Sequence, residues 1–174
     1  MNYNQFGYPT EPSEQNLTEI RQTRDSDLAI LHAIEIKCHE NPMDKDELNK
    51  LMKTEQVHGI LGILRLQNAG FALFNIQDHG STVFINRFSV SQTFVDAGVV
   101  EKIISSLRAT ISGGPPADLR MVVSENDIGT PMFNKLLDQG FVGTGTIREA
   151  FFEYSREFGT NRWFDGIKLE LVGK

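Results

Sequence analysis

The apolar residues of this chain change their spacing several times, and the order of those changes restricts the folds that the chain can adopt. Alternating apolar and polar residues predict strands, whereas apolar residues three and four positions apart predict helices. The expected elements in chain order are a strand at 17–22, helices at 28–40 and 45–53, strands at 57–66, 70–77 and 81–91, a helix at 95–111, a strand at 119–124, a helix at 131–139, and strands at 141–154 and 166–172.

Two connections in this order define a topology. Short turns at 67–69 and 78–80 join the three β-rich runs between residues 57 and 91 into an antiparallel meander. The strand, helix and strand that follow, with a break at Gly113–Pro116, imply a right-handed parallel crossover. Residues 158–165 are expected to connect the last two strands. The chain is therefore predicted to be an α/β (α+β) protein with a mixed sheet.

The balance of charged residues argues against two classes of partner. The chain has 17 Lys and Arg against 23 Asp and Glu, a formal net charge of −6 and a pI of about 5.2. It lacks the excess of basic residues with which proteins bind nucleic acids and anionic membranes. Its longest apolar run, residues 59–64, is also far shorter than a membrane-spanning helix. We expect no nucleic-acid partner and no membrane.

The cysteine and histidine residues limit the redox and metal chemistry of the chain. Cys38 is interpreted either as a buried, small apolar residue or as a reactive thiol. Cys38 is the single cysteine and cannot form an internal disulfide, which predicts a reducing, cytoplasmic location. The histidines lack the paired spacing of metal ligands, so we expect no metal site. They are His32, His39, His58 and His79.

The N-terminal residues 1–16 are predicted to be a tail outside the folded domain. They are mostly polar, but Tyr3, Phe6 and Tyr8 are aromatic anchors that can dock on the body of the protein or on another chain. Docking on another chain would make the protein a homo-oligomer or part of a larger assembly.

Two stretches carry a resemblance to a known family. Residues 84–107 look like a central strand, a pyrophosphate-binding loop and the helix after it, and residues 121–141 look like the next strand and a helix that ends in Gly140 and Phe141. Together with the element order, they resemble the GNAT superfamily of acyl-CoA-dependent N-acyltransferases. The resemblance implies one domain over residues 17–174. Its sheet would be mostly antiparallel, with about six to seven strands and helices on both faces.

The resemblance also implies a site for acetyl-CoA. Backbone N–H groups from Gly98, Val99 and Val100 would hold the pyrophosphate, because a helix N-terminus presents unpaired donors and a positive dipole end. The pantetheine amides would pair with the strand edge at Phe88, Ser89 and Val90. Asn126 and Ser124 would contact the acyl or pantetheine group, unless Asn126 only shapes the helix entry.

The sequence departs from the family pattern at the loop and at both catalytic positions. Val95 stands where the family has a basic residue, and Asp96 either weakens anion binding or caps the next helix. Leu136 replaces the Tyr that serves as the acid in many members. Asn86 and Arg87 stand near the usual acidic base.

Other residues are candidates for the missing base. Glu125, just beyond the fifth predicted strand, could act through a water molecule. Glu35, His39 and Glu40 lie near the end of the first helix, beside the expected acceptor loop. For each of them the alternative is an ordinary solvated side chain.

These observations lead to two hypotheses about function. The first is an acetyl-CoA-dependent N-acetyltransferase in which a small-molecule amine or a protein amino group attacks the thioester directly. The second is a catalytically inactive GNAT-fold structural or interaction subunit, for example of a virus or phage particle, which the departures and the tail favour. The C-terminal aromatic residues Phe158, Trp163 and Phe164 are interpreted as core packing, and 150–154 as sheet core or an edge used for association.

Overall fold

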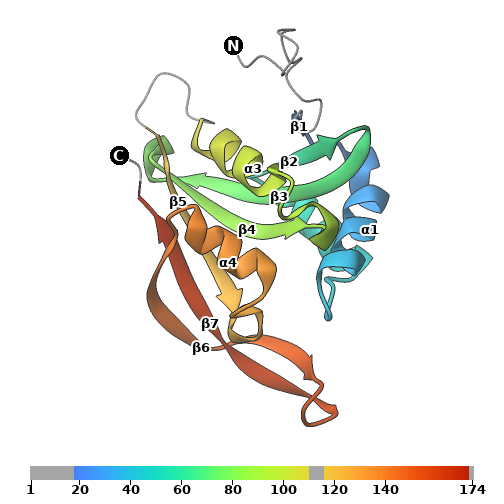
Figure 1. Cartoon of the computed structure of the whole chain (residues 1–174), viewed down its shortest axis with the longest axis vertical. Coiled ribbons are helices and arrows are strands. Elements are labelled where there is room, and N and C mark those ends of the chain that lie inside the picture. Colours follow the sequence, from blue (N-terminus) through green and yellow to red (C-terminus); the bar gives the residue numbers. More distant parts are fainter. Residues whose placement is uncertain (1–17, 110–115, 173–174) are drawn as a thin grey trace, which may run out of the picture.

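The computed structural model describes residues 18–109 and 116–172, which contain one seven-stranded sheet in the order β1-β2-β3-β4-β5-β7-β6 (Figure 1). Neighbouring strands are antiparallel except for the β4–β5 pair. This arrangement confirms the predicted fold class, including the meander and the parallel crossover. The strands are β1 (Thr18–Gln22), β2 (Val57–Leu64), β3 (Gln67–Gln77), β4 (Thr82–Val90), β5 (Asp118–Ser124), β6 (Val142–Ser155) and β7 (Thr160–Leu171).

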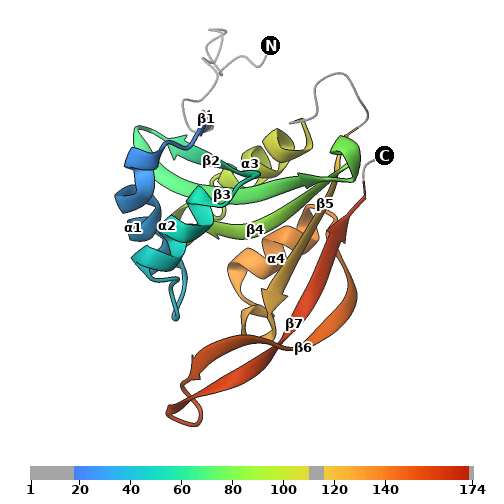
Figure 2. The same cartoon turned by 180° about the vertical axis from the view of Figure 1, so that it is seen from behind.

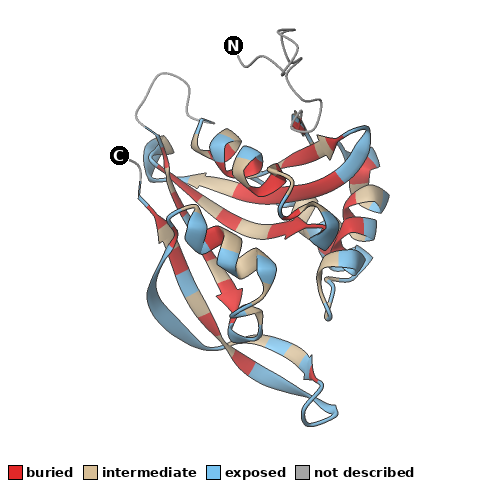
Figure 3. Cartoon of the chain, in the orientation of Figure 1, coloured by how far each residue is buried: buried red, intermediate tan, exposed pale blue. Residues whose placement is uncertain are grey.

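Helices cover both faces of the sheet, as Figures 1 and 2 show from opposite sides. Helices α3 (Val99–Arg108) and α4 (Pro131–Asp138) pack on one face, and α1 (Leu28–Cys38) and α2 (Lys45–Lys53) on the other. Adjacent residues of β2 face opposite ways, so that Ile60 joins the core under α3 and Leu61 joins the core under α1. The buried residues therefore run along the central strands (Figure 3).

The middle strand β4 contains one residue more than its partner. Leu73 of β3 pairs with Arg87, but the next residue, Phe74, pairs with Ile85, so that Asn86 is a β-bulge. The parallel pairing of β4 with β5 ends at Ile85, the residue before the bulge. Beyond that point β4 continues beside β3 and β5 continues beside β7. The two central strands therefore separate at Asn86.

Two predicted connections differ from the structure. The β2–β3 turn is formed by Arg65 and Leu66, both with positive φ, and residues 67–69 already belong to β3. A two-residue turn of this kind matches the twist of the strands, although Arg and Leu are unusual there. The helix predicted from residue 95 begins only at Val99, because Gly98 has a left-handed φ of +82°. Residues 110–115, with the predicted end of that helix, lie outside the described residues.

The C-terminal hairpin is longer than the sequence predicts. Residues 160–165, expected to be a connection, form the first half of β7 and pair with the end of β6. This part of the hairpin extends from the rest of the sheet as an arm (Figures 1 and 2). Phe158 and Trp163 are 56% and 54% exposed, so their predicted core packing is wrong, whereas Phe164 is buried.

The predicted N-terminal tail, residues 1–16, lies outside the described residues. Within residues 18–109 and 116–172, no helix has both the length and the apolar character needed to cross a lipid bilayer.

The core under α1 gives a stability prediction. Leu31 is fully buried between α1 and the sheet, whereas Ile36 on the same helix is 55% exposed. Leu31→Ala should lower the free energy of unfolding by about 2–5 kcal/mol, because it leaves a cavity, and Ile36→Ala by less than about 0.5 kcal/mol. Urea unfolding measures both. Equal losses would contradict this placement of α1.

Candidate active site

Two adjoining cavities open where β4 and β5 separate. The first, which we call the β4–β5 cavity, has a volume of about 260 Å³ and lies between the ends of these strands and α4. The second, the hairpin cavity, has a volume of about 450 Å³ and extends to the β6–β7 hairpin. Residues that line both include Cys38, His39, Glu40, Phe88 and Asp127. The two cavities therefore form one continuous space.

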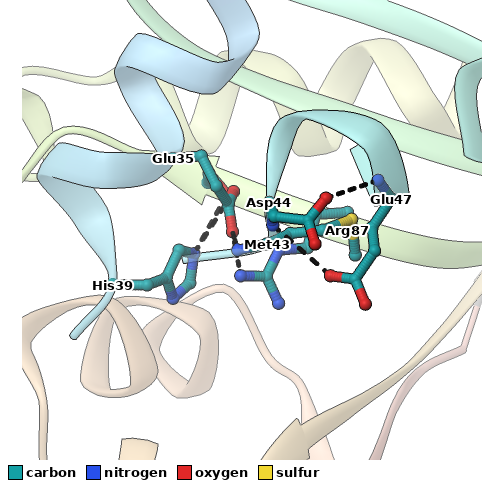
Figure 4. A network of polar contacts seen from close by, with 7 residues as sticks. Glu35, His39, Met43, Asp44, Glu47 and Arg87 are labelled. Atoms are coloured by element: carbon teal, nitrogen blue, oxygen red, sulfur yellow. Dashed lines mark hydrogen bonds and ion pairs between the residues drawn. The ribbon is translucent and has the colours of Figure 1, made fainter. Parts of the chain in front are cut away.

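The carboxylate of Glu35 is the centre of a buried polar network beside this space (Figure 4). It forms an ion pair with Arg87 of β4, accepts a hydrogen bond from Ser89 Oγ at 2.7 Å, and accepts another from the backbone N–H of Met43 at 3.1 Å. The network joins α1, β4 and the loop between α1 and α2. Burial alone would raise the pKa of Glu35, but the hydrogen bond and charge of Arg87 hold it below its usual value.

His39 is the member of the network that lines both cavities. Its Nε2 lies 3.0 Å from Ser89 Oγ and 3.8 Å from Glu35 Oε2. Burial, together with the nearby charge of Arg87, lowers the pKa of His39 to about 4. The imidazole is therefore neutral at pH 7. Burial and the charge of Glu35 raise the pKa of the adjacent Cys38 thiol to about 12, so Cys38 is a protonated thiol.

Acidic side chains that the sequence reasoning missed line the opposite wall. Asp127, in the short turn after β5, lines both cavities, and its pKa is raised by burial and by the charge of Glu153. Glu153 of β6 lines the hairpin cavity and accepts hydrogen bonds from Asn126 Nδ2 at 2.9 Å and Ser124 Oγ at 3.3 Å. Glu153 could not be found from the sequence, because only the fold brings β6 beside the end of β5.

The structure brings together most of the predicted site residues. Phe88, Ser89 and Val90 line the β4–β5 cavity at the end of β4, next to His39. Glu35 reaches the cavities only through His39 and Ser89, because its own side chain is fully buried.

The two candidates after β5 differ in their surroundings. Asn126 lines the hairpin cavity. Glu125 lines neither cavity, and its Oε1 accepts a hydrogen bond from the backbone N–H of Asp165 at 3.1 Å. Its carboxylate is thus directed to β7 rather than to the cavities.

The predicted phosphate loop lies at the start of α3. Gly98 is the N-cap of this helix, and the space beside its Cα is open, since an added Cβ would meet no atom within 4 Å. Asp96 is exposed and two residues before the cap, so the interpretation of Asp96 as the helix cap is wrong. Positive charge comes from Lys135 of α4, whose Nζ lies 2.9 Å from Glu101 Oε1. Glu101 and, more weakly, Asp96 raise the pKa of Lys135.

Leu136 lines the β4–β5 cavity and is buried. This position therefore offers no proton donor to the cavity.

The shifted pKa of His39 predicts a pH-dependent stability. The folded protein binds a proton at His39 only near pH 4, whereas the unfolded chain binds one near pH 6.5. Stability from this group is complete above pH 6.5 and is lost as the pH falls towards 4, a change of at most about 3 kcal/mol. Urea unfolding between pH 4 and 7 should show this slope, and His39→Gln should reduce it. The same slope in both proteins would contradict the burial of a neutral imidazole.

Comparisons with known proteins agree on the fold. No family model and no curated protein sequence matches the chain. Among solved structures, the ribosomal-protein-S18-alanine N-acetyltransferase from Escherichia coli is 17% identical, covering 89% of this chain and 93% of its own, with a TM-score of 0.66. Arabidopsis thaliana NAA60 in complex with a bisubstrate analogue is 15% identical, covering 88% and 97%, with a TM-score of 0.68.

A third structure, that of YncA from Salmonella typhimurium with its cofactor acetyl-CoA, is 17% identical, covering 90% of this chain and 94% of its own, with a TM-score of 0.61. These likenesses extend over most of each chain, and they concern the fold. With its seven-stranded sheet separated between β4 and β5 and its helices on both faces, the chain has the fold of the GNAT acetyltransferases.

Proposed function

We propose that this protein is an N-acetyltransferase that uses acetyl-CoA as the acyl donor. The open edge of β4 beyond Asn86 carries the proposal. Phe88, Ser89 and Val90 lie on this strand after its pairing with β5 has ended, and they line a cavity between the two strands. An unpaired strand edge supplies backbone donors and acceptors for the amides of a linear ligand such as pantetheine. The structural neighbour with bound acetyl-CoA supports this choice of donor.

The phosphates of the donor would lie at the start of α3. The first N–H groups of a helix have no partner within the helix, and those of Val99, Val100 and Glu101 are in this position. The left-handed Gly98 leaves open space in front of them. Lys135 would offset the negative charges of Asp96 and Glu101. The loop itself has no basic residue for this purpose, because Val95 stands at the basic position of the family.

The acceptor would enter through the hairpin cavity as a cationic primary amine. Two of the charged groups in this cavity already have ionic partners, since Arg87 pairs with Glu35, and Arg156 pairs with Glu40 at 3.0 Å. The remaining carboxylates are those of Asp127, Glu153 and Glu157. An excess of negative charge attracts an ammonium group, whether of a small molecule or of a protein. The protein N-acetyltransferases among the structural neighbours support an amine acceptor.

Transfer would be direct, without an acyl-enzyme. The thiol of Cys38 is protonated at neutral pH because burial raises its pKa to about 12, so it is a poor nucleophile. The proton of Ser89 Oγ is held by Glu35, whose pKa is low, so this carboxylate is a poor base for the hydroxyl. The amine nitrogen would therefore attack the thioester carbon itself. A cytoplasmic location, where both acetyl-CoA and a free thiol persist, is part of the proposal.

A second candidate function is that of a non-catalytic interaction subunit. The observation in its favour is an exposed aromatic pair on the hairpin arm, Phe152 and Trp163, whose ring centroids are 5.1 Å apart, with Tyr154 also exposed nearby on β6. Exposed aromatic residues are enriched where proteins associate. In this case, residues 1–16 would add to an assembly contact. Such a subunit requires no binding of acetyl-CoA.

Titration calorimetry with acetyl-CoA and CoA separates the two candidates. The wild-type protein should bind both ligands with micromolar affinity, and Gly98→Trp should weaken binding at least about tenfold by filling the space before α3. Gly159→Trp is the matched control, because Gly159 also has a left-handed φ (+64°) but lies at the hairpin tip. Strain at each site costs about 1–2 kcal/mol. No binding at millimolar ligand, or equal effects of the two variants, would contradict the proposal.

The carboxylates of the hairpin cavity predict that the acceptor is positively charged when it binds. Glu153→Gln should raise the KM for a primary amine about fivefold, the effect of losing about 1 kcal/mol of ion pairing, with little change in the KM for acetyl-CoA. Release of CoA from acetyl-CoA in the presence of a panel of primary amines measures both constants. Glu149→Gln removes the same charge from the same strand outside the cavity and should have no effect. Equal behaviour of the two variants would place the acceptor elsewhere.

A further inference from the structure

Three side chains from two elements form a continuous hydrogen-bonded chain that ends in the cavities. Ser89 Oγ of β4 lies 2.7 Å from Glu35 Oε2 and 3.0 Å from His39 Nε2. Glu35 and Ser89 are buried, and His39 lines both cavities. The order is therefore carboxylate, hydroxyl and imidazole, with the imidazole at the open end. In a serine hydrolase the imidazole stands in the middle, so this chain has a different use.

The number of protons shared by Glu35, Ser89 and His39 determines which ring nitrogen of His39 is protonated. An ionised carboxylate only accepts hydrogen bonds, and the ion pair with Arg87 keeps Glu35 ionised. The single proton of Ser89 Oγ must therefore point to Glu35, which leaves a lone pair of this oxygen facing His39. Because an oxygen lone pair can only accept, Nε2 of His39 carries a proton and donates it. A neutral imidazole protonated at Nε2 has a bare, accepting Nδ1.

The bare nitrogen belongs to a side chain that lines both cavities. Nδ1 has no hydrogen-bond partner in the part of the chain that the structure describes, and it is not among the three buried side-chain atoms there that lack a partner. It is therefore accessible to solvent. Figure 4 shows Nε2 on the side of the ring that faces Glu35, which leaves Nδ1 for a molecule in the cavity.

We propose that Glu35 and Ser89 are positioning residues that fix His39 in its Nε2–H form, so that Nδ1 takes the proton of the attacking amine and then passes it to the departing thiolate. This inference rests on the proposed function, and it assigns both proton transfers to one residue. It also explains how the thiolate can be protonated although Leu136, which lines the same cavity, offers no proton.

The proposed step balances. The acceptor, bound as an ammonium group, first loses one proton to solvent. The lone pair of the resulting neutral amine forms the new C–N bond at the thioester carbon, and the C–S bond then breaks with its electron pair leaving on sulfur. The proton lost by the nitrogen moves to His39 Nδ1 and from there to the sulfur. The products are the N-acetyl amide and CoA thiol, and His39 returns to its neutral form. No covalent enzyme intermediate or other co-reactant is needed.

The charges around His39 keep Nδ1 of the imidazole unprotonated at rest. Arg87 on β4 opposes a second proton on the imidazole, whereas Glu35 on α1 favours one. Glu40 and the thiol of Cys38 flank His39 along the chain, and Asp127 faces the same cavity from the turn after β5. Burial and Arg87 prevail and lower the pKa of His39 to about 4. The resting Nδ1 is thus unprotonated. The same low pKa makes it a weak base, which takes the proton once C–N bond formation has placed a positive charge on the amine nitrogen, and a strong acid towards a thiolate.

Nitrogen NMR of the full-length protein tests the positioning part without any substrate. Long-range ¹H–¹⁵N correlation distinguishes a protonated ring nitrogen from a bare one. Wild-type His39 should show one form, with Nε2 protonated and Nδ1 bare, from pH 5.5 to 8. Ser89→Ala should give a mixture of both forms, and Ser89→Thr should restore the single form. A mixture, or a protonated Nδ1, in the wild-type protein would overturn the proposal even if every variant failed to fold.

Turnover with acetyl-CoA and the amine panel tests the transfer part. His39→Gln should lower kcat by about a hundredfold or more, the usual contribution of a positioned acid or base, with little change in the KM for acetyl-CoA. Ser89→Ala should lower kcat less, and Ser89→Thr should recover it. Ser91→Ala is the matched control, because Ser91 is also buried at the end of β4 but lines neither cavity.

The two experiments fail separately. Unchanged kcat in His39→Gln would overturn the proton transfer and leave the proposed function intact. If acetyl-CoA binds but no amine is acetylated, the transfer step and the proposed function both fall. The NMR result then still decides whether Glu35 and Ser89 fix the form of His39.

Discussion

One extra residue in β4, Asn86, determines both where the cavity opens and which side chains meet there. Side chains alternate along a regular strand, and a bulge shifts that alternation by one residue along the sequence for everything that follows. Val83 and Ile85 point into the core under α3 and α4, and after the bulge Phe88 and Val90 take up that direction. If Asn86 were part of a regular strand instead of a bulge, Arg87 and Ser89 would face that apolar core. Because Asn86 bulges, they face Glu35 on α1 at the point where β4 leaves β5.

The ion pair between Glu35 and Arg87 depends on this arrangement. Two charges buried in a protein interior stabilise it only when their hydrogen bonds are satisfied, and the loss of one partner typically costs about 3–5 kcal/mol. Here Ser89 and the backbone of Met43 supply further hydrogen bonds to the carboxylate. The pair thereby attaches α1 and the loop after it to the open end of β4. His39, which follows α1, is held at the junction of the two cavities by the same contacts.

Much of the fold could be predicted from the spacing of apolar residues, because a long segment with regular apolar spacing buries its apolar face whatever its other residues are. The meander and the parallel crossover were predicted in this way, whereas the helices on both faces were implied by the resemblance to the GNAT superfamily. The bulge was missed, although a signal exists: the buried apolar positions Val83 and Ile85 are followed by Phe88 and Val90, a step of three rather than two.

The same reasoning explains the outcome at the site. Glu35, Ser89 and His39 were singled out separately, and their connection through Ser89 depends on how α1 packs against β4. Asp127 and Lys135 were missed because their roles arise from neighbours that are distant in sequence.

A crystal structure of the full-length protein with acetyl-CoA tests the central claim most directly. The account predicts pantetheine along β4 beyond Asn86, pyrophosphate at the start of α3 and the thioester beside His39. A cofactor bound away from the gap between β4 and β5 would contradict it.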